Sequence, residues 1–377
     1  MEGVVMTVAD HRQSLRGKKV FVTGHTGFKG SWLLLLLDAL GAKTTGYSLA
    51  PPTKPSLFLA AGLTDLVEMH HEADIRDPAR LAAAVTRAEP DVILHLAAQP
   101  LVRLSHREPL DTFSTNVVGT ASLLDAVRQA GKPCVVISVT SDKCYQPHAD
   151  GRPHAETDPL GGRDPYSASK GAAELVVAAY RESFFSPARL ADHGVQLATV
   201  RAGNVIGGGD WAEDRIVTDI VRQLAAGAAV PVRNPTAVRP WQHVLEPLTG
   251  YLALAATMLA KPGAEWCSGW NFGPATDDDI NVQQLTEIFI AAWGSGRWVD
   301  IHDPRAPIET HVLRLATTKA LAGLSWRPRL SAREAIQRTA AWYKKFAAEP
   351  AAARGLCLAD IAAYETANRI HTPGTRA

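Results

Sequence analysis

Cysteine is scarce in this chain, and it is not arranged for disulfides or for metal binding. The four cysteines are scattered along 377 residues and form no C-x-x-C pair: Cys134, Cys144, Cys267 and Cys357. Isolated thiols of this kind are typical of a reducing compartment. No H-E-x-x-H or similar ligand spacing occurs either. The sequence therefore predicts reduced thiols, a cytoplasmic protein and no bound metal.

Charge of one sign and long apolar runs are also missing. The formal net charge is +1 with 20% charged residues, which excludes the basic surface of a typical nucleic-acid-binding protein and offers no acidic tail. The longest apolar run, 32–37, is far too short to span a bilayer. Residues 1–18 lack the apolar core of a signal peptide. We therefore expect neither nucleic acid nor membrane as a partner, and no signal peptide.

What the sequence does contain is a strand, a glycine turn and a helix near its start. The β-branched and aromatic run 19–23 precedes the turn, and the apolar segment 31–40 follows it. The turn has the spacing G-x-x-G-x-x-G, with Gly24, Gly27 and Gly30. Glycines at this spacing let backbone N–H groups approach a pyrophosphate at a helix N-terminus. The pattern favours a dinucleotide site over a glycine-rich turn without a ligand.

The type of dinucleotide is left open by the second and third expected strands. Many nicotinamide sites place an acidic residue after the second strand to bind the adenosine ribose, but none lies between Ala39 and Thr64. NAD and NADP therefore both remain possible from this pattern. Asp74 beside Ile75, after the third strand, could hold an adenine edge. Asp77 is compatible with capping a helix over 78–89.

Strands and helices alternate through the first two hundred residues. The expected strands are 19–23, 44–49, 68–73, 91–96, 133–139 and 195–201, and the expected helices are 31–40, 78–89, 108–131 and one from 165. Alternation predicts an α/β fold, a Rossmann-type doubly wound parallel sheet. Shorter elements after residue 210 predict a smaller, discontinuous C-terminal substrate-binding lobe. We expect an N-terminal extension (1–18), a dinucleotide-binding domain (19–203), a lobe with some segments returning to that domain (204–348) and a C-terminal extension (349–377).

The ends of two expected strands carry small or polar residues. Leu96 is followed by Ala97 and Ala98, which are small enough for a cofactor to lie across the strand end. The strand 133–139 is followed by polar residues, namely Thr140, Ser141, Asp142 and Lys143. Ligands bind outside the carboxyl ends of strands in open parallel sheets, so we expect the chemistry here.

The spacing of Tyr166 and Lys170 predicts that their side chains lie close together. Four residues apart, they lie on one face of the helix that starts near 165. A lysine ammonium and a positive nicotinamide ring would favour the phenolate and make Tyr166 a base near neutral pH. Ser141 could hydrogen-bond the same substrate hydroxyl. An exposed Tyr/Lys pair without function is the alternative for this spacing alone.

Six motifs together carry a resemblance to known enzymes. They are Gly24–Gly30, Ser48–Pro52, Ser141–Lys143, Tyr166–Lys170, Gly203–Trp211 and Arg239–His243. Over about residues 15–345 the chain resembles the extended short-chain dehydrogenase/reductases that act on nucleotide sugars, and most closely the CDP-glucose 4,6-dehydratase family. The resemblance implies NAD as cofactor, CDP-glucose as substrate, and a homodimer formed through the helices 108–131 and 165–185.

The resemblance also implies an internal redox cycle and roles for individual residues. The sugar is oxidised at C4, loses water across C5–C6 and is reduced at C6. Tyr166, Lys170 and Ser141 serve the C4 hydroxyl, and Asp142, if burial raises its pKa, is the acid for the C6 hydroxyl. Lys143 stands where dTDP-glucose and GDP-mannose dehydratases carry Glu. Our hypothesis is that Lys143 is the C5 base, which requires its neutral form.

Binding residues follow from the same resemblance. The implied NAD contacts are Gly24, Thr26, Gly27, Phe28, Gly30, Asp74, Ile75, Leu96, Ala97, Ala98, Thr140, Tyr166 and Lys170. Asn204, Arg215 and Arg239 match positions that contact the nucleotide diphosphate, for which guanidinium groups are suited. Arg215 could equally be a solvated residue at a helix start.

Three other functions compete with this interpretation. A nucleotide-sugar 4-epimerase would share Ser141, Tyr166 and Lys170 but would not need Asp142 and Lys143. A dehydratase for another nucleotide sugar would keep the whole set. A non-catalytic NAD-sensing protein could lose Tyr166 or Lys170 without penalty, whereas this chain retains both.

Overall fold

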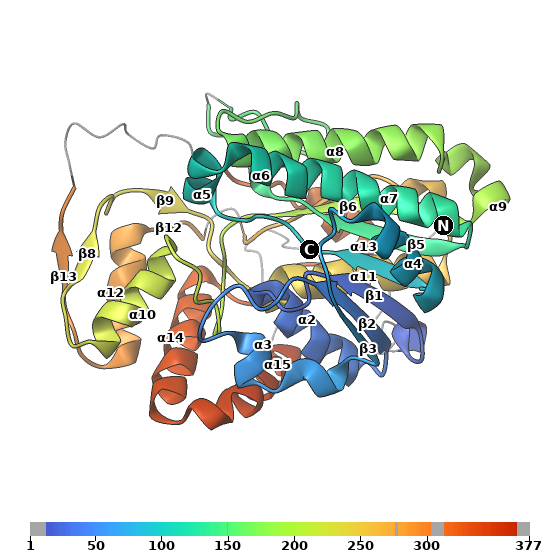
Figure 1. Ribbon diagram of the computed structural model, residues 1–377. Coiled ribbons are helices and arrows are strands. Elements are labelled where there is room, and N and C mark those ends of the chain that lie inside the picture. Colours follow the sequence, from blue (N-terminus) through green and yellow to red (C-terminus); the bar gives the residue numbers. More distant parts are fainter. Residues whose placement is uncertain (1–12, 149, 276–277, 303–312, 368–377) are drawn as a thin grey trace, which may run out of the picture.

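The structure is a computed structural model that describes residues 13–148, 150–275, 278–302 and 313–367 (Figure 1). Most of the expected N-terminal extension and the last ten residues of the C-terminal extension therefore lie outside the described residues. No helix within the described ranges has the length and apolar character needed to cross a membrane.

A seven-stranded sheet forms the centre of the molecule. Its strands are β1 (Lys19–Thr23), β2 (Lys43–Ser48), β3 (Met69–Glu72), β4 (Val92–His95), β5 (Cys134–Val139), β6 (Val195–Ala202) and β11 (Gly269–Phe272). Their order is β11-β6-β5-β4-β1-β2-β3, and every pairing is parallel. The predicted doubly wound parallel sheet is confirmed. The chain reverses its winding direction between β1 and β4. Open parallel sheets bind ligands at such a reversal, outside the carboxyl ends of the strands.

Helices cover both faces of the sheet because its central strands are apolar on both sides. On one face, α2 (Phe28–Ala39) and α11 (Leu245–Ala260) pack with Val20 and Val22. On the other, α4 (Pro78–Ala88), α7 (Gly119–Ala130) and α8 (Pro165–Ser183) pack with Phe21. Figure 1 shows α7 and α8 running together along one side of the sheet.

The expected continuous helix over 108–131 is interrupted. It consists of α6 (Pro109–Phe113), a π-helical turn at Ser114–Val118, and α7. Gly119 opens α7 against Ile75, whose side chain occupies the space of a Cβ atom. π-turns are common at functional sites, and this one turns the buried Asn116 inward.

The later elements form a smaller lobe beside the sheet, at the left of Figure 1. Its helices are α10 (Ile216–Ala225), α12 (Val282–Trp293) and α14 (Ala332–Ala348). Its short strands pair as β8 (Val230–Val232) with β13 (Trp298–Asp300), and β9 (Val238–Arg239) with β12 (Ile280–Asn281). β7 (Val205–Ile206) pairs with β10 (Gln242–His243). Asn281 and Ser331 cap α12 and α14 through capping boxes, which fixes where both helices begin.

Five further helices complete the labelled elements of Figure 1. They are α3 (Leu57–Ala60), α5 (Val102–Arg107), α9 (Leu190–His193), α13 (Thr318–Leu324) and α15 (Ala353–Thr366). The C-terminal extension thus contributes a helix that the sequence analysis did not predict. Cys357, Ile361 and Tyr364 bury its inner face, and the helix packs beside α2 and α14.

Candidate active site

The glycine turn lies at the carboxyl end of β1 and has no room for side chains. Gly24 has a φ of +74°, and a Cβ atom there would come within 2.7 Å of the Ala97 backbone nitrogen. A Cβ atom on Gly30 would overlap the Gly24 carbonyl oxygen. α2 begins at Phe28, three residues earlier than expected, and the N-cap Gly27 supplies no side-chain cap. The uncapped N–H groups and the glycine cradle fit a dinucleotide pyrophosphate.

The adenosine end of this crevice is lined by neutral hydroxyls. Thr26 Oγ1 donates to the Leu49 carbonyl at 2.9 Å and lies 2.8 Å from Ser48 Oγ. These groups stand where many nicotinamide sites place an acid. Asp74 is engaged by Arg76 at 2.6 Å, and Arg76 also pairs with Asp111. The hydrogen bond from Arg76 lowers the pKa of Asp74, which stays ionised.

Ser141, Asp142 and Lys143 form a short turn at the carboxyl end of β5. Ser141 caps a 3-10 turn over Asp142–Cys144, accepting from the Lys143 backbone N–H at 3.2 Å. Its hydroxyl donates to Asp142 Oδ1 at 2.8 Å. Asp142 is 4% exposed, and burial raises the pKa of its carboxyl despite the nearby Lys143 charge. This is the environment that a carboxylic acid needs to retain a proton.

Tyr166 and Lys170 project from the first turns of α8, which begins after the N-cap Asp164. Both side chains are buried, and the polar side chain of Ser141 favours the phenolate form of Tyr166. Burial raises the pKa of Tyr166 to about 12 and lowers that of Lys170 to about 8. Without the positive nicotinamide ring that the expectation also requires, desolvation of the Tyr166 phenolate outweighs the favourable charges, so the role of Tyr166 as a base near neutral pH stays a prediction.

Asn116 links the two halves of this site, and no pattern in the sequence pointed to it. Its Oδ1 accepts from the Gln99 backbone N–H at 2.8 Å, and its Nδ2 donates to Ser169 Oγ at 2.8 Å. The π-turn thereby ties the segment after β4 to the residue next to Lys170.

Lys29 also faces the catalytic groups without having been predicted. Burial lowers its pKa to about 8, and its charged neighbours include Arg215, Lys170, Asp142 and Asp210. Lys29 is the second residue of α2, and its charged neighbours follow β5 and β6 in the chain. Because only the fold brings them together, spacing in the sequence did not predict a role for Lys29.

The three predicted diphosphate contacts lie on two loops and a short strand of the smaller lobe. Asn204 follows Gly203, whose backbone lies against Asp142. Arg215 Nε is 3.3 Å from Asp210 Oδ2, and its charge reaches Tyr166 and Lys29. Arg239 is on β9 and donates to the Val238 carbonyl at 2.8 Å. The charge of Arg215 thus acts on the catalytic groups.

A buried ion pair between Glu174 on α8 and Arg201 on β6 lies next to the catalytic residues in the fold. Glu174 on α8 accepts from Arg201 Nε at 2.7 Å and from Thr140 Oγ1 at 2.5 Å. Thr199 donates to the other oxygen of Glu174 at 2.8 Å. The network fixes the end of β5, where Thr140 precedes the catalytic turn, relative to α8.

Comparison with known proteins agrees with this geometry. Residues 20–265 match the model of the NAD dependent epimerase/dehydratase family. The chain is 48% identical to a CDP-glucose 4,6-dehydratase from Salmonella typhimurium over 329 residues, which cover 87% of this chain and 91% of that protein.

Solved structures share the fold. A UDP-glucose-4-epimerase from Stenotrophomonas maltophila with bound NAD has a TM-score of 0.74 and 25% identity, covering 87% of this chain and 98% of the other. DesIV, a dTDP-glucose 4,6-dehydratase from Streptomyces venezuelae with NAD bound, has a TM-score of 0.73 and 24% identity, covering 88% and 99%. The chain belongs to the NAD-dependent epimerase/dehydratase family, and NAD is its cofactor.

Proposed function

We propose that this protein is a CDP-glucose 4,6-dehydratase, which converts CDP-D-glucose to CDP-4-dehydro-6-deoxy-D-glucose and water. The observation that carries the proposal is the buried Asp142, which accepts a hydrogen bond from Ser141 and whose pKa is raised by burial. An epimerase needs no such acid. The 48% identity to a CDP-glucose 4,6-dehydratase supports the nucleotide.

The glycine turn, Thr26, Ala97 and Lys170 would hold NAD in the crevice between β1 and β4. Bound NAD supplies the reversible oxidation of the sugar at C4 and its later reduction at C6. The remaining NAD contacts named above, from Phe28 to Thr140, stay predictions of the same site.

Tyr166 takes the proton of the C4 hydroxyl, and Ser141 holds that oxygen in place. Because burial raises the pKa of Tyr166 to about 12, the phenolate must be stabilised by positive charge. Lys170 and the positive nicotinamide ring provide it together, with Lys170 also binding the ribose. The 4-keto group then makes the C5 proton acidic enough to remove.

Dehydration uses the turn after β5. Lys143, in its neutral form, takes the C5 proton, while Asp142 gives its proton to the departing C6 hydroxyl, which leaves as water. After reduction at C6, the proton on Lys143, which exchanges with solvent, returns to C5. Tyr166 releases the proton of the C4 hydroxyl and Asp142 takes one up, so no net proton is gained or lost. A Lys143→Met variant tests the base: it should lose solvent deuterium incorporation at C5, and a wild-type rate of incorporation would exclude Lys143 from this role.

Arg215 and Arg239 are proposed to bind the two phosphates, with Asn204 as a further donor. Arg215 Nε lies 3.3 Å from Asp210 Oδ2, and its positive charge acts on Lys29 and Tyr166. The role of Arg239 stays a prediction.

The proposal is tested with purified protein, catalytic NAD and separate CDP-, dTDP-, UDP- and GDP-sugars, followed by mass analysis. Loss of one water from CDP-glucose alone is expected. Dehydration of a different nucleotide sugar would support the proposed reaction but exclude CDP-glucose as the substrate. An unchanged mass with every sugar would reject the dehydratase, and epimerisation would then be assayed.

We also propose a cytoplasmic homodimer. The cytoplasmic assignment rests on four unpaired cysteines. Large apolar side chains are exposed on neighbouring helices: Leu110 on α6 (84%), Val118 on the π-turn (54%) and Leu175 on α8 (62%). Exposed apolar groups on adjoining helices are suited to pairing with a second copy. A Leu110→Asp/Leu175→Asp variant should elute as a monomer in light-scattering chromatography, and a wild-type monomer would overturn the proposal.

A further inference from the structure

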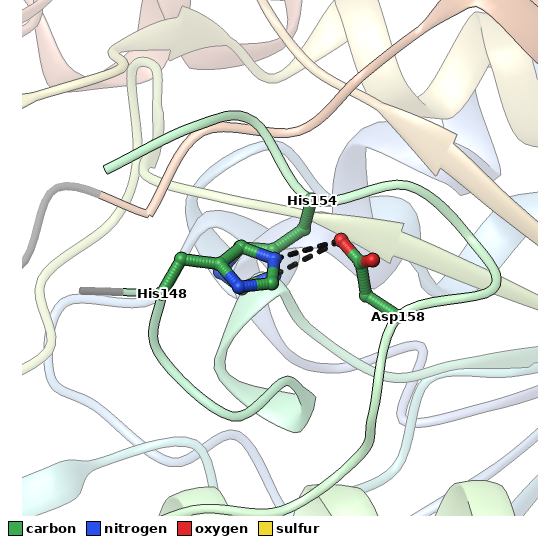
Figure 2. A group of neighbouring side chains, drawn as sticks. All are labelled: His148, His154 and Asp158. Carbon is green, nitrogen blue, oxygen red and sulfur yellow. Dashed lines mark hydrogen bonds and ion pairs between the residues drawn. The ribbon is translucent and has the colours of Figure 1, made fainter. Parts of the chain in front are cut away.

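The long connection between the two halves of the site, residues 146–163, contains a compact cluster, the histidine clasp: His148, His154 and Asp158 (Figure 2). His148 Nε2 lies 2.8 Å from Asp158 Oδ2, and His154 Nδ1 lies 3.6 Å from the same oxygen. The two imidazoles are stacked, with centroids 4.1 Å apart and planes inclined by 19°. His154 is only 1% exposed.

The clasp is better suited to holding the loop than to binding a metal. Its three candidate ligand atoms lie within 4.8 Å of one another. An imidazole nitrogen, however, binds a metal that lies in its own ring plane, and two nearly parallel stacked rings do not share such a point. Arg152 also donates to both Asp158 oxygens, at 3.0 and 3.1 Å, and so neutralises the carboxylate.

The stack continues from the clasp to the catalytic turn. The other neighbour of the His154 ring is Tyr145, stacked at 4.7 Å with an 11° angle. The Arg201 guanidinium lies over the Tyr145 ring at 4.8 Å, and Tyr145 donates its hydroxyl hydrogen to Asn271 Oδ1 at 2.8 Å. His148, His154, Tyr145 and Arg201 therefore form one continuous column. Burial lowers the pKa of His154 to about 4, so its ring is neutral in this column.

Tyr145 connects this column to the turn that carries Asp142 and Lys143. It directly follows the 3-10 turn and ends it, with its backbone N–H 3.4 Å from the Asp142 carbonyl. The backbone of His154 is itself fixed, because its N–H donates to the Arg314 carbonyl and its carbonyl accepts from Asn271 Nδ2 at 2.9 Å. The His154 ring stacked on Tyr145, and the Arg201 guanidinium that lies over the same ring and donates to its hydroxyl, leave the end of the turn little freedom to move.

We propose that His154 is a positioning residue for the dehydration half of the reaction, acting through its stack on Tyr145 to fix the turn that carries Asp142 and Lys143. The inference rests on the proposed function. The effect of His154 should fall mainly on dehydration, because Asp142 and Lys143 lie within the turn that Tyr145 ends, whereas Tyr166 and Lys170 lie on α8. Loss of the His154 ring should therefore affect elimination of water more than oxidation at C4.

The test compares His154→Ala, His154→Phe and the exposed control His302→Ala in the full chain. In single turnovers with CDP-glucose, His154→Ala should accumulate reduced nicotinamide, seen by its near-ultraviolet absorbance, because C4 oxidation proceeds while dehydration slows by roughly 10- to 100-fold. His154→Phe keeps an aromatic ring against Tyr145 and should restore most of the dehydration rate. His302, whose side chain is 58% exposed, should behave as wild type when replaced.

A second readout does not depend on the reaction. Hydrogen–deuterium exchange of the peptide containing Cys144 and Tyr145 should be faster in His154→Ala than in wild type, with other buried peptides unchanged. If His154→Ala does not fold, the milder His148→Ala variant replaces it, and the exchange rate of the same peptide should again be faster than in wild type. Equal slowing of both chemical steps, or unchanged exchange in this peptide, would overturn the proposal. So would stoichiometric zinc retained by wild type and lost by His154→Ala.

If wild type converts no nucleotide sugar, the proposed function fails, and the exchange experiment still decides whether His154 orders the turn.

Discussion

The Asp142 carboxylate lies against the backbone of Gly203: a Cβ atom at residue 203 would come within 2.8 Å of Asp142 Oδ2. The turn after β5 and the loop after β6 thus meet at this carboxyl group. The acid has its buried position because residue 203 lacks a side chain. Burial in turn raises the pKa of Asp142, so this one contact connects a glycine in the sequence to the proton that dehydration requires.

Gly203→Ala should impair dehydration while preserving the fold. The new methyl group meets a side-chain carboxylate, which can turn away, rather than fixed backbone. Displacing the acid by a fraction of an ångström to an ångström should lower kcat about tenfold or more. Steady-state kinetics and the melting temperature measure the two effects. Gly355→Ala, where a Cβ atom would meet nothing within 4 Å, is the control. An unchanged kcat for Gly203→Ala would contradict this account of Asp142.

Two glycines of the nucleotide loop should respond differently to alanine. At Gly30 a Cβ atom meets the Gly24 carbonyl oxygen, which cannot move freely, so Gly30→Ala should destabilise the fold by about 1–3 kcal/mol. At Gly27 the nearest protein atom would be 3.4 Å away, so Gly27→Ala should fold normally. It should nevertheless bind NAD more weakly, because its methyl group projects where the pyrophosphate approaches. Calorimetric titration with NAD checks this, and wild-type affinity in Gly27→Ala would place the cofactor elsewhere.

The pH dependence of kcat/KM should report Lys170. Burial lowers the pKa of Lys170 to about 8, so the side chain is charged below that pH and neutral above it. The positive charge stabilises the Tyr166 phenolate, and activity should therefore fall as the pH rises through about 8. Lys170→Arg, which stays charged, should have lower activity without this alkaline loss. An alkaline limb that persists unchanged in Lys170→Arg would assign it to another group.

Removing the charge of Glu174 alone should lower the free energy of unfolding more than replacing both Glu174 and Arg201 by apolar residues. Burial alone would raise the pKa of Glu174, but the hydrogen bond and charge of Arg201 outweigh it and hold that pKa below its ordinary value. Glu174→Gln leaves the Arg201 charge buried and should cost about 3–5 kcal/mol in urea unfolding. Glu174→Leu combined with Arg201→Met should cost less. A smaller loss in the single variant than in the double variant would contradict the ion-pair account.

The lowered pKa of Glu174 also predicts the direction in which the free energy of unfolding changes with pH. A carboxyl whose pKa is lowered by folding contributes stability above its unfolded pKa, and that contribution is lost as the pH falls through the folded value. The difference in unfolding free energy between wild type and Glu174→Gln should therefore shrink in acid.

Local sequence signals predicted most of the sheet and several helix starts. Asp77 and Asp164 cap α4 and α8 as their positions before proline indicated, accepting from Arg80 N–H and Ser167 N–H at 3.0 Å each. The alternation of apolar strands with helices was sufficient for the parallel sheet. These features depend on neighbours in sequence, and sequence patterns contain that information.

Features that depend on distant neighbours were not predicted. The π-turn at Ser114–Val118 arises where Gly119 packs against Ile75 and Asn116 reaches Ser169. The surroundings of Lys29 come from loops after β5 and β6. The raised pKa of Tyr166 reflects burial that spacing from Lys170 does not reveal.

The central claim is that one active site oxidises C4, removes water and reduces C6 with the same cofactor. CDP-glucose carrying deuterium at C4 tests it most directly, with NAD in catalytic amount and analysis of the product by mass and NMR. The account predicts a product that has lost one water and carries the label at C6. Loss of the label to solvent, or its retention at C4 with no water lost, would contradict the account.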